Sequence, residues 1–407
     1  MLLKRFCLSF VGLFALNVAA NLPDSSNEFS HKIATRVFES KAENTCVSGA
    51  SIHHALGMAL MGTGKGSATR HELLKVLGLN DQTELKELAS GYASMLNDLK
   101  QSCASERPGQ VPELTMTNKV VLFNGIEVEP SFLELTGTMG AQAQTFKKGT
   151  PTTDILADIN DWVSSKTEKK IPSILSKLEP DDVMVLLNAV YFKGEWAKSF
   201  SKNATGDADF RQLNKSIKKV PMMFSGRACN YLATSDGEIL ELPYGGLSTQ
   251  NGPRFSMFFV LPAENKDFAH AYADFDVALL DKVAHAKKKK YGHISIPKFK
   301  VETSLDLVAT LKDMGMSSAF SDEADFTDIS KEQLLKLGQA VHKTFIDVNE
   351  SGTEAAAATA ITMGPRATSI NVAPTVEFNF VADRPFFFFI RDNEQKLVLF
   401  EGTIVNP

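Results

Sequence analysis

Beyond its first twenty residues, the sequence contains no apolar run long enough to cross a bilayer, and it has only four cysteines among 407 residues. A membrane-spanning helix needs about 20 apolar residues, so we expect the mature protein to be soluble. The formal net charge of -5 at pH 7 argues against nucleic acid as the main partner. The sequence also lacks G-x-S-x-G and HExxH motifs, which leaves a hydrolase without support.

The first twenty residues are typical of an export signal. Lys4 and Arg5 precede an apolar run from Phe6 to Val18, and Ala20 provides a small residue for cleavage. The alternative is a membrane anchor, but about 13 apolar residues are too few to span a bilayer. We therefore expect residues 1–20 to be removed and residues 21–407 to be secreted.

The mature chain retains an odd number of cysteines, Cys46, Cys103 and Cys229. At most one disulfide is possible, so stability must come mainly from a large core. No cysteine has a CxxC or metal-ligand spacing, and we expect no metal site. Cys46 lies at the start of a predicted buried strand, where a free thiol packs as a small hydrophobe.

Three Asn-X-Ser/Thr sequons fit a secretory route. Asn203 and Asn214 lie in polar, loop-like sequence, and we predict that both carry glycans. Asn349 adjoins a segment that is predicted to enter a sheet, so we do not expect a glycan there.

Helical periodicity dominates the first half of the chain, and strand-like runs follow in the second half. Helices followed by scattered strands, without βαβ alternation, predict the α+β class. The predicted helices are Glu28–Phe38, Ile52–Leu60, His71–Leu77 and Glu84–Leu99. The predicted strands are Leu114–Phe123, Val183–Phe192, Phe255–Leu261, His293–Phe299 and Phe386–Ile390, the last buried on both faces.

Two motifs suggest ligand binding but have simpler interpretations. The stretch from Gly62 to Ser67 resembles a phosphate-binding loop, yet Gly66 separates Lys65 from the serine, and a predicted helix precedes it. We interpret it as a helix-terminating turn. The run Lys287, Lys288, Lys289 and Lys290 is either a solvated turn or a site for a heparin-like polyanion.

The segment from Thr353 to Met363 alternates with a period of two. One face collects Thr353, Ala355, Ala357, Thr359, Ile361 and Met363, whereas the only charge, Glu354, lies on the other. This pattern is typical of a strand with one buried face. The residues are also small and end in Gly-Pro-Arg, so the same segment can remain an exposed loop. Such a segment is a candidate for insertion into a sheet.

This segment resembles the reactive-centre hinge of serpins, which are inhibitors of serine proteases, and the resemblance extends over nearly the whole mature chain. The resemblance implies one helix-rich domain over residues 21–407, with three sheets and an exposed reactive-centre loop at about 350–377. The matching blocks are Ile159–Val163, Asn188–Trp196, Ile296–Phe299, Phe380–Phe386 and Gly402–Pro407.

The resemblance also assigns roles to individual residues. The hinge comprises Gly352, Thr353, Glu354, Ala355, Ala356, Ala357, Ala358 and Thr359. A polar shutter beneath the sheet comprises Ser48, Ser51, Asn188 and His342, and Trp196 belongs to the adjoining breach. The family pattern Ser-Pro-x-Ser reads Ser48-Gly49-Ala50-Ser51 here, which predicts a less rigid backbone at that point.

The scissile bond in serpins lies fourteen residues beyond the hinge glycine, which implies Arg366–Ala367. Arg366 is also the only basic residue between Gly352 and Arg384. An arginine pairs with the acidic specificity pocket of a trypsin-like protease. Gly364 and Pro365 before it resemble sequences favoured by thrombin-like enzymes, and other trypsin-like targets stay open.

The resemblance therefore implies a suicide inhibitor that traps its protease as an acyl-enzyme on Arg366. We expect a monomer that is not an enzyme and needs no cofactor. A non-inhibitory serpin that acts as a carrier or chaperone is the alternative. A second departure from the family is the extended stretch between Ala367 and Pro374, which adds residues on the leaving-group side.

Overall fold

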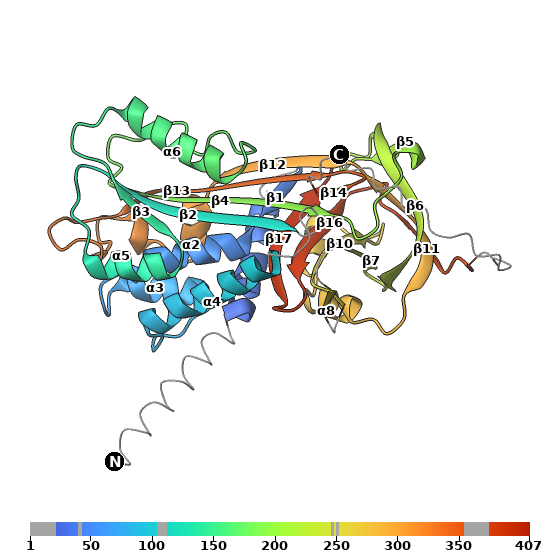
Figure 1. Ribbon diagram of the computed structural model, residues 1–407, viewed down its shortest axis with the longest axis horizontal. Coiled ribbons are helices and arrows are strands. Elements are labelled where there is room, and N and C mark those ends of the chain that lie inside the picture. The colour runs from blue at the N-terminus through green and yellow to red at the C-terminus, as the bar shows by residue number, and fades with distance from the viewer. Residues whose placement is uncertain (1–21, 40–42, 104–111, 246–247, 250–251, 354–373) are drawn as a thin grey trace, which may run out of the picture.

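A computed structural model of the chain describes residues 22–39, 43–103, 112–245, 248–249, 252–353 and 374–407. Figure 1 shows a long sheet running along the molecule, with many of the helices at one end and a second sheet toward the other. Helices prevail in the first part of the described chain and strands in the second, without a regular βαβ repeat, which confirms the predicted α+β class.

Two helix starts are fixed by side chains that the sequence provides. Ser48 accepts a hydrogen bond from the backbone N–H of Ser51 and caps α2, and Ser67 caps α3 in the same way. The Gly62 to Ser67 stretch is therefore the connection between two helices. The helices are residues 22–39, α2 (Gly49–Met61), α3 (Ala68–Val76), α4 (Leu85–Cys103), α5 (Pro130–Thr138), α6 (Thr152–Lys166), α7 (Phe268–Ala273), α8 (Ala278–Ala284) and α9 (Val308–Asp313), with 3-10 turns η1 (Lys202–Ala204) and η2 (Ser318–Phe320).

The long sheet has six strands in the order β12-β13-β14-β4-β2-β3. Its central neighbours β13 and β4 run parallel, whereas β14 runs antiparallel to both. The strands are β12 (Phe299–Asp306), β13 (Leu337–Val348), β14 (Gly352–Thr353), β4 (Met184–Glu195), β2 (Glu113–Leu122) and β3 (Gln142–Thr145).

Strand β4 is apolar on both sides because helices cover both faces of the long sheet (Figure 1). Val185 and Leu187 pack with Ile159 of α6, and Leu186 and Val190 belong to the main core on the side of α2. Burial of each Val or Leu side chain stabilises the fold by roughly 2 kcal/mol. Because a shift of one residue would exchange the two faces of the strand, this packing fixes which side chains of β4 face α2.

The second sheet has nine strands, and a third sheet has two. The phenylalanine run of β16 is completely buried between β10 and β17, as its lack of polar alternation predicted. The nine strands are β1 (Thr45–Val47), β17 (Leu397–Ile404), β16 (Phe386–Asp392), β10 (Phe255–Pro262), β7 (Gly237–Pro243), β6 (Ile217–Ala233), β11 (Lys290–Pro297), β15 (Phe378–Val381) and β5 (Thr205–Arg211); the two-stranded sheet pairs β8 (Ser248–Thr249) with β9 (Gly252–Pro253).

One predicted strand is wrong in its extent. The run from His293 to Phe299 is divided between β11 and β12, because the chain leaves one sheet and enters the other at Lys298. The backbone N–H of Lys298 still donates to the carbonyl oxygen of Pro221 in β6, and the following residue, Phe299, already pairs with Val348 of β13. Residue pattern alone does not show which sheet a strand joins.

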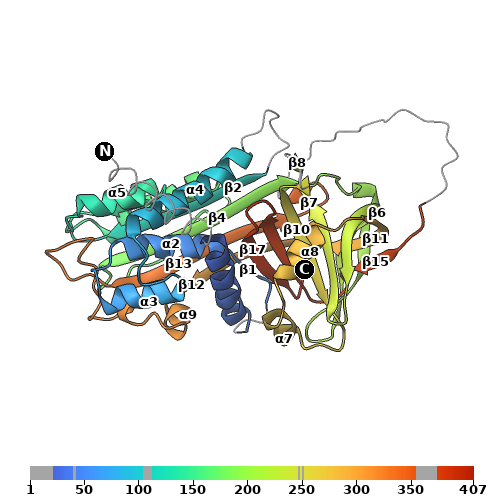
Figure 2. The ribbon, with the colours of Figure 1, turned by 90° about the horizontal axis from the view of Figure 1, so that it is seen from below.

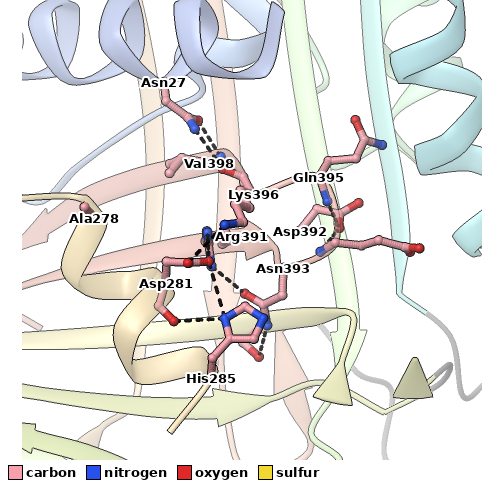
Figure 3. A network of polar contacts seen from close by, with 12 residues as sticks. Asn27, Ala278, Asp281, His285, Arg391, Asp392, Asn393, Gln395, Lys396 and Val398 are labelled. Carbon is pink, nitrogen blue, oxygen red and sulfur yellow. Dashed lines mark hydrogen bonds and ion pairs between the residues drawn. The ribbon is translucent and has the colours of Figure 1, made fainter. Parts of the chain in front are cut away.

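The carboxy-terminal strands are tied to the first helix and to α8 (Figure 3). Asn27 donates to the carbonyl oxygen of Lys396 at 2.7 Å and accepts from the N–H of Val398 at 2.8 Å. Asp281 of α8 binds the buried Arg391 at 2.9 Å and Lys396 at 3.1 Å. Segments at opposite ends of the sequence thus hold one another in place.

Cys46 is free and buried, as expected for a thiol that packs as a small hydrophobe, and Cys229 is free and buried as well. Burial raises the pKa of Cys229 to about 11. The side chain of Cys103 lies outside the described residues. In the part of the chain that the structure describes, no helix is long and apolar enough to cross a membrane.

Candidate functional site

The most informative feature of the long sheet is the wedge formed by β14. Strands β13 and β4 pair directly over eight residue pairs, from Leu337 opposite Met184 to Phe345 opposite Tyr191. Beyond that point the two strands separate, and Thr353 pairs with Val348 on one side and Gly194 on the other. The first two residues of the predicted hinge, Gly352 and Thr353, therefore already lie between the central strands.

Aromatic side chains hold this wedge. Thr353 is fully buried, and its hydroxyl lies 2.7 Å from that of Tyr244. The Tyr244 ring stacks on Trp196 with ring centroids 4.8 Å apart. The indole N–H of Trp196 donates to the carbonyl oxygen of Asn349 at 2.9 Å. The predicted breach residue Trp196 thus contacts the turn that leads into the hinge.

Gly352 requires the absence of a side chain. Its φ is +156°, and a Cβ there would meet the carbonyl oxygen of Gly194 at 2.0 Å. No real Cβ atom comes that close to backbone, so any other residue would push the hinge out of the gap between β13 and β4. The glycine at the start of the hinge is thus a packing requirement.

Glu350, in the turn before the hinge, is a residue that the sequence analysis missed. Its carboxylate accepts from the Thr205 hydroxyl at 2.9 Å and pairs with Lys298 at 3.0 Å. Burial raises the pKa of Glu350, but its hydrogen bonds, including those from Lys298 and Thr205, outweigh this effect and lower it overall. No motif marked Glu350, because its partners Thr205 and Lys298 come from distant parts of the chain.

The four predicted shutter residues lie together under the junction of β4 and β13. The backbone N–H of Ser48 donates to Nε2 of His342 at 3.1 Å, and Nδ1 of His342 donates to Oδ1 of Asn188. Nδ2 of Asn188 donates to the hydroxyl and to the carbonyl oxygen of Ser51. These bonds join the two central strands to the start of α2, and every member is buried.

The buried network extends beyond the predicted set. Asn188 also donates to Oδ1 of Asn118 on β2, and Asn118 donates to Nδ1 of His54 on α2. His54 in turn donates from Nε2 to the carbonyl oxygen of Met139 at 3.1 Å, and its neighbour His53 contacts the hydroxyl of Tyr92 at 2.8 Å. An asparagine within an otherwise strand-forming run was the only sequence signal for Asn118.

These histidines are neutral in the folded protein. Burial lowers the pKa of His342 to about 3 and that of His53 and His54 to about 4. Each ring nitrogen of His342 has a defined partner, one donating to it and one accepting from it, which a doubly protonated ring could not match. The network therefore fixes one proton arrangement as well as one packing.

Other predicted site residues lie outside the described residues. These are Glu354, Ala355, Ala356, Ala357, Ala358, Thr359, Gly364, Pro365, Arg366 and Ala367. The sequon residues Asn203 and Asn214 are exposed, and Asn349 is half-buried with its side-chain oxygen bonded to the N–H of Ser351.

Lys287, Lys288 and Lys289 lie in the connection between α8 and β11, whereas Lys290 is half-buried and begins β11. Lys287, Lys288 and Lys289 are exposed, and Lys288 makes only a distant contact of 3.8 Å to Glu377. Elsewhere in the described ranges, no three His, Cys, Asp or Glu side chains are placed to hold a metal ion.

The long sheet therefore has parallel central strands that are parted at one end by Gly352 and Thr353. The serpin (serine protease inhibitor) family model matches residues 24–407 of this chain. The chain therefore belongs to the serpin family. Most members of this family are inhibitors of proteases.

Individual relatives support this assignment. The chain is 34% identical over 381 residues to Serpin-Z2A of Triticum aestivum, covering 91% of each chain. It is 33% identical to the leukocyte elastase inhibitor of Equus caballus, covering 89% of this chain and 93% of that one. The structure of human thyroxine-binding globulin matches with a TM-score of 0.81 at 26% identity, covering 96% and 98% of the two chains. The expected three-sheet serpin fold is confirmed.

Proposed function

We propose that the chain is a secreted inhibitor of trypsin-like serine proteases, which attack the Arg366–Ala367 bond and are trapped by insertion of the hinge into the long sheet. The observation that carries this proposal is the wedge, because Gly352 and Thr353 already pair with β13 and β4. Insertion only has to continue a ladder that has begun.

The register of the wedge specifies where the remaining hinge residues would go. Thr353 lies opposite Gly194 and Val348, and each further residue advances one position along both neighbours. Thr359, six residues on, would come opposite Asn188 and His342, which lie six residues before Gly194 and Val348. These two side chains are now bonded to each other. The Thr359 hydroxyl could then bond to the groups that insertion separates.

Energy favours insertion. The β13–β4 junction is parallel, and an inserted hinge would replace it with two antiparallel junctions, which are slightly more stable per residue. The net gain is about one hydrogen bond per inserted residue at roughly 1 kcal/mol each, before the cost of ordering the segment. Ile361 and Met363 would add roughly 2 kcal/mol each on the core side. The native protein is then kinetically trapped.

Arg366 supports a trypsin-like target. A guanidinium binds a carboxylate in a bidentate manner, and this is the charge that a trypsin-like specificity pocket provides. Gly364 and Pro365 before it resemble sequences favoured by thrombin-like enzymes, and other trypsin-like targets stay open. Acylation forms an ester between the protease serine and the Arg366 carbonyl carbon, and Ala367 leaves as the new amino terminus.

A non-inhibitory carrier is the second candidate, since thyroxine-binding globulin shares the fold. The small residues from Thr353 to Thr359 favour inhibition, because bulky or charged inward side chains would hinder insertion.

The decisive experiment is incubation with trypsin, followed by denaturing electrophoresis. A covalent complex and a released peptide that begins at Ala367 are expected, and Arg366→Ala should lose the complex while keeping its unfolding temperature. A carrier would be cleaved without trapping the enzyme. A different new amino terminus would disprove the assignment of the scissile bond.

Export by residues 1–20 and glycosylation at Asn203 and Asn214 complete the proposal. Both asparagines are exposed, which glycosylation requires. Mass spectrometry of protein from a secreting eukaryotic host should show Asn21 as the first residue, with glycans removed by Asn203→Gln and Asn214→Gln.

A further inference from the structure

A cavity of about 210 Å³ lies between the nine-stranded sheet and the two short helices α7 and α8 (Figure 2). Its floor comes from the sheet, and its wall comes from the two helices and the connection between them. The apolar lining comprises Ile239 of β7, Val260 of β10, Phe387 of β16, Ala271 of α7, Leu279 of α8 and Phe275 of the connection. The three side chains of the floor are buried, so the cavity reaches the core.

The surrounding backbone and rings keep this cavity open. The turn between β6 and β7 passes the cavity at Gly237, where a Cβ would meet the carbonyl oxygen of Leu261 at 2.4 Å. The turn therefore contributes no side chain at this point. On the opposite wall, the half-buried ring of Phe275 stacks on that of Phe389, with ring centroids 5.2 Å apart. The apolar floor offers water few hydrogen bonds, so an apolar group can displace water from it at little cost.

Charged side chains surround the mouth of the cavity. The charged and titratable residues of the lining are all exposed and comprise Asp236, Lys266, His270, Asp274 and Asp276. Lys266 pairs with Asp236 at 2.8 Å, and His270 pairs with Asp267, next to the lining, at 2.9 Å. Three carboxylates thus stand against one lysine, so the mouth favours a cation.

The cavity is distinct from the polar network of Figure 3. Leu279 faces the cavity, whereas Asp281 binds Arg391 and Lys396. Residues two positions apart in a helix are separated by about 200° around its axis, so the two sites lie on different sides of α8. A ligand in the cavity therefore leaves these ion pairs intact.

We infer that this cavity binds a small aromatic amine, with the ring on the apolar floor and the ammonium group among the carboxylates at the mouth. The volume suits a single ring, because a cavity of about 150 Å³ with an apolar lining holds benzene. Phe275 and Phe387 favour an aromatic ligand, since rings attract one another in offset-stacked and edge-to-face arrangements. The site takes no part in the proposed reaction with a protease.

The test titrates the full mature chain with phenethylamine by calorimetry, with no protease present. A dissociation constant of about 0.1–1 mM is expected for a ligand of this size. Phenylacetate has the same ring and the opposite charge, and it should bind at least tenfold more weakly. Ala271→Leu fills the cavity and should abolish binding of phenethylamine. Ala269→Leu, the same change at an exposed position of α7, should match the wild type.

A second pair of variants tests the charge at the mouth. Asp274→Asn combined with Asp276→Asn removes two charges and keeps hydrogen-bond acceptors. Because both carboxylates are exposed, this variant should weaken binding of phenethylamine by only about fivefold, and by less in high salt. Asp313→Asn, at an exposed position of α9, is the control and should bind as the wild type does.

Unfolding temperatures without ligand verify that each variant is folded. If Ala271→Leu does not fold, methyl NMR of the wild type takes its place, and the Ile239 signal, assigned with Ile239→Val, should shift on addition of phenethylamine. Three results would each overturn the site: no detectable binding of phenethylamine, equal binding by Ala271→Leu, or equal affinity for phenylacetate. The proposed function would stand in all three cases, because the test contains no protease.

Discussion

The hydroxyl of Thr353 lies 2.7 Å from that of Tyr244, which fastens the start of the hinge between β13 and β4. Both side chains are buried, and Trp196 stacks on the tyrosine ring. The hinge therefore has a fixed starting point, and the remaining residues need only extend an existing register.

Thr353→Arg should convert the inhibitor into a substrate. The site is fully buried, and an unpaired arginine there costs several kcal/mol, so β14 should leave the gap and insertion should slow. Hydrolysis of the acyl-enzyme would then precede trapping. The measurement is the stoichiometry of inhibition of trypsin, with Thr353→Ser as the control that keeps the hydroxyl. Trapping by Thr353→Arg at wild-type stoichiometry would contradict the insertion mechanism.

Thr359→Val should leave the intact protein unchanged but reduce the stability of the cleaved form. The wedge register places residue 359 between Asn188 and His342 after insertion, where valine offers no hydrogen bond. Asn188 and His342 would then lack a buried hydrogen-bond partner, which should lower the stability of the cleaved form by roughly 1–3 kcal/mol. Calorimetry of intact and cleaved protein measures the difference, and Thr362→Val on the opposite strand face is the control. Equal losses for both variants would refute the register.

Asn188→Ala should destabilise the intact protein by roughly 3 kcal/mol, because His342, Ser51 and Asn118 each lose a buried partner. The same change loosens the junction of β4 and β13, so the sheet should accept a strand from another molecule on mild heating. Native gels report oligomers, and scanning calorimetry reports the unfolding temperature. Asn203→Ala, an exposed asparagine, serves as control. A wild-type unfolding temperature for Asn188→Ala would be incompatible with this network.

Stability should fall as the pH decreases from about 6.5 toward 4. The pKa of His342 is lowered to about 3 and those of His53 and His54 to about 4, so these side chains are neutral when folded but take up protons when unfolded. The neutral histidines contribute fully to stability above the pKa that they have in the unfolded chain. By pH 5, proton uptake by each histidine in the unfolded chain lowers the free energy of unfolding by roughly 2 kcal/mol. His54→Gln should reduce this fall by about one third. The apparent unfolding temperature at pH 7.5 and pH 5 provides the measurement.

A pH dependence of the same size in His54→Gln would exclude His54 from this effect. The buried Glu401 acts in the opposite sense, since burial raises its pKa and its destabilising charge is lost in acid. The comparison of variant with wild type removes this contribution, which both proteins share.

Replacing Lys287, Lys288, Lys289 and Lys290 by glutamine tests the lysine run. If the run binds a polyanion, wild-type protein should be retained on heparin, retention should fall with salt, and the variant should elute early. The control replaces Lys65, Lys86, Lys300 and Lys312, which lie elsewhere in the chain. Equal retention of the two variants would show that the lysine run is only a solvated turn and not a polyanion site.

Much of the fold followed from residue patterns. The periodicity at Ile52–Leu60 predicted α2, and the unbroken run at Phe386–Ile390 predicted a strand buried on both faces. The His293–Phe299 run was predicted as one strand because both halves have the same apolar pattern, yet they belong to different sheets. The apolar pattern of a strand shows that the strand is buried. Which strand it pairs with depends on segments that are distant in the sequence.

The shutter also contains some residues that the sequence indicated and others that only the structure revealed. Resemblance to serpins indicated Ser48, Ser51, Asn188 and His342. Asn118 had only the weak signal of an asparagine in a strand-forming run, and the sequence analysis did not assign His54 to the network. Their role depends on three elements meeting at one buried point, which no local pattern encodes.

The sequence by itself determined the family, the small residues of the hinge and the position of Arg366, because these depend on residue identity and spacing. Only the tertiary structure decided that Gly352 and Thr353 already lie between β13 and β4, and which residues they oppose there. Strand register results from the packing of side chains that are far apart in the chain, and a shift of one residue would turn every hinge side chain to the other face.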